Sequence, residues 1–155
     1  MKVCSLFCGI GGIDLMLAQY GHTVVWANDN DKYACMTYRH NFPQVKLKEG
    51  DIRDIDKTTI PDFDILAAGF PCQPFSVCGK GKGFDDPRGN LFFEIGKTID
   101  AQRPLIVFLE NVANLIEHDR GRTFDIIHKE LAGRDYYLRY HVADACEYAN
   151  VPQHR

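Results

Sequence analysis

The sequence predicts an α/β protein built on a mostly parallel sheet, with helices covering both faces of that sheet. Two observations predict this fold. Short apolar runs alternate with segments of helical periodicity along most of the chain. These runs show little polar alternation, which is typical of strands that are covered on both sides. The chain has 155 residues, 45% of them hydrophobic and 25% charged, so we expect a single domain over 1–155.

Each expected strand is a short apolar or β-branched run, and each expected helix has apolar residues at helical spacing. Three helices end near Gly21, Pro43 and Gly133, because glycine accepts the left-handed backbone of a helix end and proline cannot continue a helix. In chain order we expect a strand at 2–7 (KVCSLF), a helix at 12–21 (GIDLMLAQYG), a strand at 23–27 (TVVWA), a helix at 30–42 (NDKYACMTYRHNF), strands at 44–50 (QVKLKEG) and 63–69 (FDILAAG), a helix at 90–102 (NLFFEIGKTIDAQ), a strand at 105–112 (LIVFLENV), a helix at 121–134 (GRTFDIIHKELAGR) and a sixth strand at 136–143 (YYLRYHVA).

Composition excludes several classes of protein. No apolar run is long enough to cross a membrane, and the N-terminus lacks the long apolar region of a signal peptide, so we expect a cytoplasmic protein. The six cysteines form no C-x-x-C pair and lie far from the histidines, which argues against a metal site and against a disulfide framework. A net charge of -3 gives no global basic surface for nucleic acid, so any such surface is local or lies outside this chain.

The candidate site residues follow five successive strands. They are the glycine turn at 9–12, Asp29, Asp51, the segment 71–73, and the segment 110–112. Ligands of parallel α/β sheets bind beyond the carboxyl ends of the strands. The sequence therefore predicts a site at this edge of the sheet.

The first three strand ends indicate a nucleoside ligand. FCGIGG opens a helix and lets backbone approach a ligand, but the dinucleotide pattern G-x-G-x-x-G fails because its last position is Asp14. Asp29 can bind two ribose hydroxyls, and Asp51 can accept a hydrogen bond from an adenine amino group while Ile52 packs on the ring. A tight turn and a helix cap are the plain structural alternatives. These residues offer no strong phosphate-binding group, so S-adenosylmethionine, which has no phosphates, suits the predicted site better than NAD.

The last two strand ends carry candidate reactive groups. Cys72 lies between Pro71 and Pro74, where a rigid thiol near lysines can be a nucleophile. Glu110 ends an apolar strand, and a desolvated carboxyl group there would have a raised pKa and could hold a proton. The glycine- and lysine-rich run that follows Cys72 is either a solvated surface loop or a mobile lid that meets phosphates.

These motifs resemble those of the DNA cytosine-5 methyltransferases. FCGIGG, GFPCQPFS, LENV and the final VPQHR stand in the family's order, and the likeness covers essentially the whole chain. The resemblance implies a Rossmann-like S-adenosylmethionine-dependent methyltransferase fold that is incomplete here. It also implies transfer of a methyl group to carbon 5 of a cytosine that is flipped out of DNA, through a covalent cysteine adduct. Sequence-specific methylation in a bacterial or phage restriction-modification system is the expected setting.

The resemblance also assigns roles to residues. Cys72 would attack the ring, Glu110 would engage it, and Arg155 would hold the base or nearby backbone. The lid would run from Ser76 to Arg88. The implied cofactor-binding residues are Phe7, Gly9, Ile10, Gly11, Gly12, Asp29, Asn30, Asp51, Ile52, Gly69, Pro71 and Leu91; the implied DNA-side and supporting residues are Gln73, Ser76, Lys80, Lys82, Arg88 and Asn111.

Two departures from the family pattern leave alternatives open. Asn30 stands where the family often has an aromatic residue that stacks on the cofactor. The sequence ends at Arg155, before the family's second arginine and its target-recognition domain, so we expect a catalytic front half. This half is a truncated chain, one subunit of a split enzyme whose second polypeptide carries target recognition, or a decayed remnant. The alternatives are an RNA cytosine methyltransferase and a catalytically incompetent fragment or binding module. A nicotinamide enzyme is more distant, because the glycine fingerprint fails.

Overall fold

The computed structural model describes residues 1–71 and 91–149. The chain forms two compact units. The first contains residues 1–71 and 91–110, and the described part of the second contains residues 111–149.

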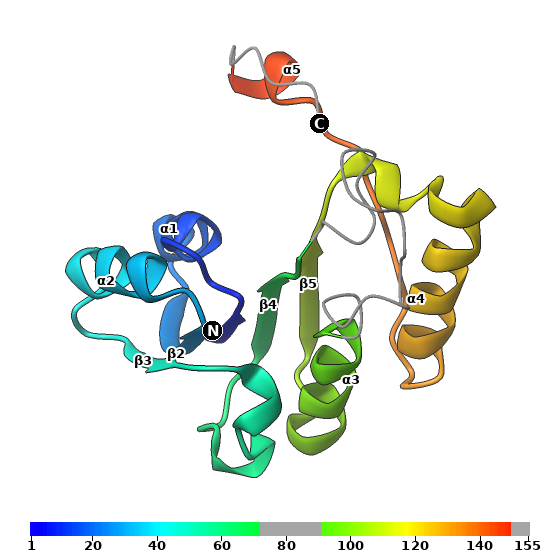
Figure 1. Ribbon diagram of the computed structural model, residues 1–155. Coiled ribbons are helices and arrows are strands. Elements are labelled where there is room, and N and C mark those ends of the chain that lie inside the picture. Colours follow the sequence, from blue (N-terminus) through cyan, green and yellow to red (C-terminus); the bar gives the residue numbers. More distant parts are fainter. Residues whose placement is uncertain (72–90, 150–155) are drawn as a thin grey trace. The chain divides into compact units, whose positions relative to one another are not determined.

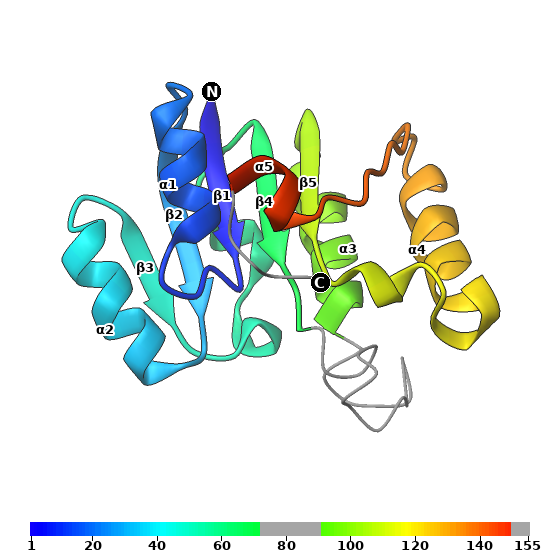
Figure 2. The same ribbon diagram turned by 90° about the horizontal axis from the view of Figure 1, so that it is seen from above.

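The first unit is built on one sheet of five parallel strands in the order β3-β2-β1-β4-β5 (Figure 2). Because β1 is central and the chain crosses from β3 to β4, the strand order reverses between β1 and β4. Such a reversal opens a crevice at the carboxyl ends of the strands. The strands are β1 (Lys2–Leu6), β2 (Thr23–Asp29), β3 (Lys46–Glu49), β4 (Ile65–Gly69) and β5 (Ile106–Glu110).

Helices cover both faces of this sheet, which confirms the predicted fold class. Figure 1 shows α1 and α2 on one face and α3 on the other. Two short 3-10 helices, η1 and η2, connect β3 to β4 and contact α3. The bounds are α1 (Gly12–Gln19), α2 (Lys32–Asn41), η1 (Ile52–Asp54), η2 (Lys57–Thr59) and α3 (Leu91–Gln102).

The core beneath α1 and α2 follows from strand alternation. Val3, Val24 and Ile65 point to the same face and pack with Leu17 of α1 and Tyr38 of α2. The Tyr38 hydroxyl donates a 2.5 Å hydrogen bond to the carboxylate of Asp14, which is itself fully buried. Burial raises the pKa of Asp14, and hydrogen bonds from Tyr38 and Ser5 oppose that rise.

The two edge strands are more exposed than the sequence predicts. Lys46 and Glu49 of β3 face solvent, and Ile106 and Phe108 of β5 are 46% and 39% exposed. Glu110 is exposed as well, so the expectation of a desolvated carboxyl group at this position is wrong. The physical reason is position: β5 ends the sheet in the described residues, so its side chains lack neighbours on one side.

The second unit is helical where the sequence predicts a helix. Its main helix buries Thr123, Ile127 and Leu131, which are spaced four residues apart on one face. The expected sixth strand at 136–143 is not formed: this segment pairs with no strand in the described residues, and Tyr137 is 90% exposed. A strand requires a neighbouring strand for its hydrogen bonds, which sequence pattern alone does not supply. The elements are η4 (Ala113–Leu115), η5 (His118–Gly121), α4 (Arg122–Ala132) and α5 (Ala145–Ala149).

Over residues 1–71 and 91–149, no helix combines the length and apolar character needed to span a bilayer. The same residues contain no group of three or more His, Cys, Asp or Glu side chains placed to hold a metal ion.

Candidate cofactor and base site

The predicted cofactor residues gather at one edge of the sheet in the first unit. Phe7 follows β1, Asp29 ends β2, Gly50 and Asp51 follow β3, and Gly69 ends β4. All four strands are parallel, so their carboxyl ends share this edge. These residues therefore lie at the edge of the sheet where the sequence predicts them.

The glycine turn after β1 has a backbone that few residues can adopt. Phe7, Gly9 and Gly11 have φ values of 54°, 55° and 96°, all in the left-handed region. A Cβ on Gly11 would lie 2.2 Å from Cε2 of Phe42. Gly11 is therefore required both by its φ and by close packing, whereas Gly12 has open space around its missing Cβ.

Asp29 braces this turn and keeps capacity to bind a ligand. Its Oδ2 accepts a 2.8 Å hydrogen bond from the Gly9 amide, and its Oδ1 accepts one of 2.8 Å from the Asp31 amide. An ionised carboxylate offers about four acceptor positions. Two positions of Asp29 are used by backbone, so two remain, which is the number a ribose diol needs.

Asn28 fixes the neighbouring strand end from within the sheet. Its side chain is 1% exposed and donates from Nδ2 to the carbonyl oxygens of Lys48 and Gly50, at 2.8 and 2.9 Å. The Gly50 amide in turn donates to the Asp29 carbonyl oxygen at 2.9 Å. The turn that leads to Asp51 is thereby tied to the strand that carries Asp29. Sequence reasoning missed Asn28, and its place one residue before Asp29 was the available signal.

Asp51 is held by Arg53, which sequence reasoning also missed. Asp51 Oδ1 accepts from the Arg53 amide and Nε, both at 2.9 Å, and Oδ2 accepts from Nη2 at 2.5 Å. These hydrogen bonds, above all those from the Arg53 side chain, lower the pKa of Asp51 to about 2. Asp51 is thus an ionised acceptor with about one acceptor position left, on Oδ2.

Ile52 and Asn30 differ in their access to a ligand. Ile52 is 2% exposed, so a ring could meet little of its side chain without local movement. Asn30, Ile10 and Gly12 are exposed, while Pro71 and Leu91 are half-buried where the described segments end and begin.

Glu110 lies beside the end of β4. In the ladder between β4 and β5, Gly69 is paired with Glu110. A Cβ placed on Gly69 would lie 3.4 Å from Glu110 Oε2 and 3.6 Å from Ile13 Cδ1 of α1. The absence of a side chain at Gly69 therefore leaves room between α1 and this carboxyl group.

Several predicted residues lie outside the described residues. These are Cys72, Gln73, Ser76, Lys80, Lys82, Arg88 and Arg155. Asn111 is described as part of the second unit, where its Oδ1 accepts a 2.9 Å hydrogen bond from the Val112 amide.

One family model matches the chain over its whole length. The family described as C-5 cytosine-specific DNA methylase matches residues 1–155, which is the whole chain. The chain belongs to this family.

Curated relatives of this DNA methylase chain are Type II methyltransferases. M.Bsp6I from Bacillus sp. is 48% identical over 157 residues, and M.HhaI from Haemophilus parahaemolyticus is 43% identical over 155 residues; both alignments cover 100% of this chain. They cover only 50% and 46% of those relatives. The chain thus spans about half the length of the curated relatives it matches.

Solved structures agree with the DNA methylase fold. A prophage-encoded DNA modification methyltransferase from E. coli has a TM-score of 0.71 at 25% identity, covering 86% of this chain and 38% of that protein. A DNMT2 variant from Spodoptera frugiperda has a TM-score of 0.62 at 30% identity, covering 83% of this chain and 40% of that protein. These comparisons favour neither the RNA substrate nor the inactive binding module.

Proposed function

We propose that this chain is the catalytic front half of a DNA cytosine-5 methyltransferase that uses S-adenosylmethionine, in a Type II restriction-modification setting. The observation that carries the proposal is the register of β4 and β5 within a C-5 methylase chain: Glu110 is paired with Gly69, three residues before Cys72 in the sequence. This short separation in sequence supports a site in which the Cys72 thiol and the Glu110 carboxyl group act on the same base.

The strand ends fit the nucleoside part of S-adenosylmethionine. Asp29 retains two acceptor positions for the ribose hydroxyls, and Asp51 retains one for the amino group of adenine. The open space around Gly9 and Gly12 leaves room for the methionine part. The remaining members of the proposed pocket are Phe7, Ile10, Gly11, Asn30, Ile52, Gly69, Pro71 and Leu91. When bound, the cofactor supplies the methyl group.

The chain's own groups would activate the base. The Cys72 thiolate forms a bond to carbon 6 of the flipped cytosine, and Glu110 holds a proton at ring nitrogen 3 as negative charge builds on the ring. Carbon 5 would then gain the methyl group as the cofactor's sulfonium becomes a thioether. The carbon 5 proton would pass to solvent water, and the bond between Cys72 and carbon 6 would break to restore the thiolate. Because Glu110 is exposed in this structure, the bound base itself would desolvate it.

DNA contacts and sequence recognition extend beyond the described residues. Lys80, Lys82, Arg88 and Arg155 would meet phosphates or the base, with Gln73, Ser76 and Asn111 supporting the pocket. A net charge of -3 and the half-length match to the relatives support a second polypeptide segment that carries target recognition. We therefore expect little turnover from the 155-residue chain alone.

Two measurements test the proposal. Calorimetric titration with S-adenosylhomocysteine should give binding that Asp29→Ala weakens, whereas titration with NAD should give none. Duplex DNA that contains 5-fluorocytosine in place of cytosine should form a covalent adduct in the presence of S-adenosylmethionine, and Cys72→Ser should abolish that adduct. An adduct that persists in Cys72→Ser, or NAD binding tighter than S-adenosylhomocysteine binding, would contradict the proposal.

A further inference from the structure

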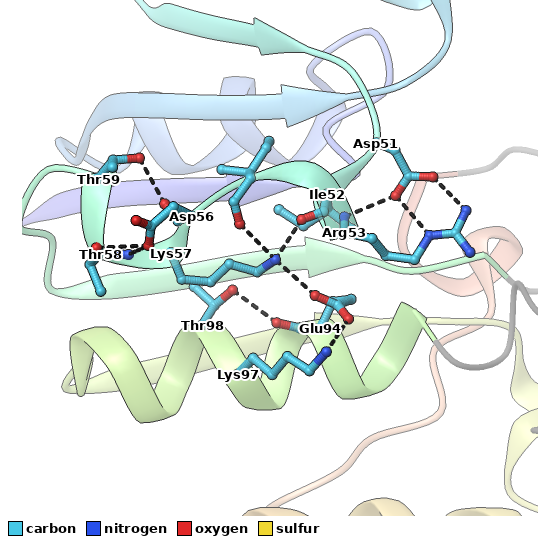
Figure 3. A network of polar contacts seen from close by, with 11 residues as sticks. Asp51, Ile52, Arg53, Asp56, Lys57, Thr58, Thr59, Glu94, Lys97 and Thr98 are labelled. Atoms are coloured by element: carbon cyan, nitrogen blue, oxygen red, sulfur yellow. Dashed lines mark hydrogen bonds and ion pairs between the residues drawn. The ribbon is translucent and has the colours of Figure 1, made fainter.

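Lys57 is a buried cation between the η1–η2 segment and α3. The residue is 9% exposed, and its Nζ contacts three oxygen atoms (Figure 3). Nζ donates to the carbonyl oxygens of Ile52 at 2.5 Å and Ile55 at 3.0 Å, and it forms an ion pair of 2.8 Å with Glu94 of α3. The ammonium group thus donates two hydrogen bonds to the backbone of this segment and has the Glu94 carboxylate as its counter-ion.

Glu94 is a buried carboxylate that pairs with two lysines. The residue is 6% exposed, and its second oxygen pairs with Lys97 Nζ at 2.7 Å. Burial opposes ionisation of Glu94, but the two ammonium groups outweigh burial and hold its pKa below the ordinary value. Glu94 is therefore a fixed charge that anchors Lys57 to α3. Gln102 holds the same segment from further along α3, donating to the Lys57 and Ile60 carbonyl oxygens at 2.8 and 3.0 Å.

The segment that Lys57 holds begins at the proposed adenine acid. Asp51 precedes η1, and the carbonyl oxygens of Asp51 and Ile52 accept backbone hydrogen bonds from Asp54 and Ile55. Lys57 Nζ binds the carbonyl oxygen of Ile52, the residue directly after Asp51. Removing the ammonium group would leave this carbonyl with the hydrogen bond from the Ile55 amide and would loosen the turn that aims the Asp51 carboxylate.

We propose that Lys57 is a positioning residue for base recognition in the cofactor site, acting through the Asp51–Ile52 turn and anchored by Glu94. The inference rests on the proposed function, because it takes the adenine of S-adenosylmethionine as the partner of Asp51. A residue that only stabilised the fold would weaken all ligands alike. A positioning residue should instead change the preference for adenine over a base that lacks the 6-amino group.

The test compares two ligands on the 155-residue chain by calorimetry: S-adenosylhomocysteine and its inosine analogue, in which a 6-oxo group replaces the amino group. We expect the wild-type chain to prefer the adenine ligand by about tenfold, since one hydrogen bond to a charged group distinguishes the two. Lys57→Met should reduce this preference to about twofold or less, chiefly through weaker binding of the adenine ligand.

Lys97→Met is the matched control. It removes a cation from the same carboxylate, but Lys97 has a side chain that is 65% exposed and has no hydrogen bond to the η1 turn. Its adenine preference should equal that of the wild type. Glu94→Gln, which keeps an acceptor for Lys57 but removes its charge, should give an intermediate preference and serves if Lys57→Met folds poorly.

The outcomes separate the two proposals. If the wild type binds neither ligand, the proposed function fails, and this inference fails with it. If the wild type prefers adenine and both Lys57→Met and Glu94→Gln retain that preference in full, only the positioning role is overturned. Amide exchange at Asp54 and Ile55 should become faster in Lys57→Met, and unchanged exchange there would also contradict the inference.

Discussion

Replacing Gly11 with alanine should destabilise the chain more than any other single-methyl addition to its described glycines. The new Cβ would lie 2.2 Å from Cε2 and 3.0 Å from Cζ of Phe42. Phe42 cannot yield easily, because it is 7% exposed and its ring lies 4.7 Å from that of Tyr38. Gly11 also has a φ of 96°, where alanine is strained.

The magnitude is the sum of two contributions. A left-handed backbone costs a non-glycine residue about 1–2 kcal/mol, and overpacking a filled core costs about 1–3 kcal/mol. We expect about 3 kcal/mol of lost unfolding free energy. With a urea dependence of about 2 kcal/mol per M, the unfolding midpoint should fall by about 1.5 M. Fluorescence of Trp26, which is 3% exposed, reports this transition.

Gly21→Ala is the matched control. Gly21 has a φ of 80° but nothing within 4 Å of its missing Cβ, so its replacement should cost only the backbone contribution of about 1–2 kcal/mol. The Gly11 penalty should shrink in a Phe42→Ala background, because the clash disappears. Equal losses for Gly11→Ala and Gly21→Ala, or no coupling to Phe42, would refute the packing argument.

Three further predictions follow from the buried and strand-end acids. Arg53 lowers the pKa of Asp51 to about 2, so ionised Asp51 stabilises the fold above its unfolded pKa, and this stability is lost as pH falls from about 4 to about 2. Arg53→Met should raise the Asp51 pKa in a carboxyl NMR titration. An unchanged pKa would contradict the pairing. Burial raises the pKa of Asp14, so the stability that this group contributes falls as pH rises through that pKa. Tyr38→Phe should move this loss of unfolding free energy to higher pH, as measured by urea unfolding. An unchanged pH dependence would show that the Tyr38 hydroxyl does not stabilise the ionised carboxylate. Asp29→Asn should weaken S-adenosylhomocysteine binding by about tenfold or more in calorimetry, whereas binding equal to wild type would remove Asp29 from the site.

Sequence pattern predicted the sheet of the first unit well because its signals are local. Runs such as ILAAG (65–69) are buried in the structure, and helix ends fall near Gly21 and Pro43 as expected. The strand ends also brought Asp29 and Asp51 to one edge, since parallel strands allow no other arrangement.

Properties that depend on distant neighbours were predicted less well. The exposure of Glu110 depends on β5 lying at an edge of the described sheet, and the segment 136–143 lacks a pairing strand. The sequence pattern around Arg53 and Lys57 did not indicate their partners. Arg53 pairs with Asp51 within one turn, and Lys57 pairs with Glu94, which lies on a helix 37 residues further along the chain. The catalytic role of Cys72 stays a prediction, since this residue lies outside the described residues.

The double engagement of Asp29 has an evolutionary consequence. Its carboxylate secures the Gly9 turn with one oxygen and the start of α2 through Asp31 with the other. Descendants that exchange this acid to favour another small molecule would first disorder their own backbone. Substitutions that change ligand preference should therefore accumulate at exposed neighbours of Asp29 such as Asn30.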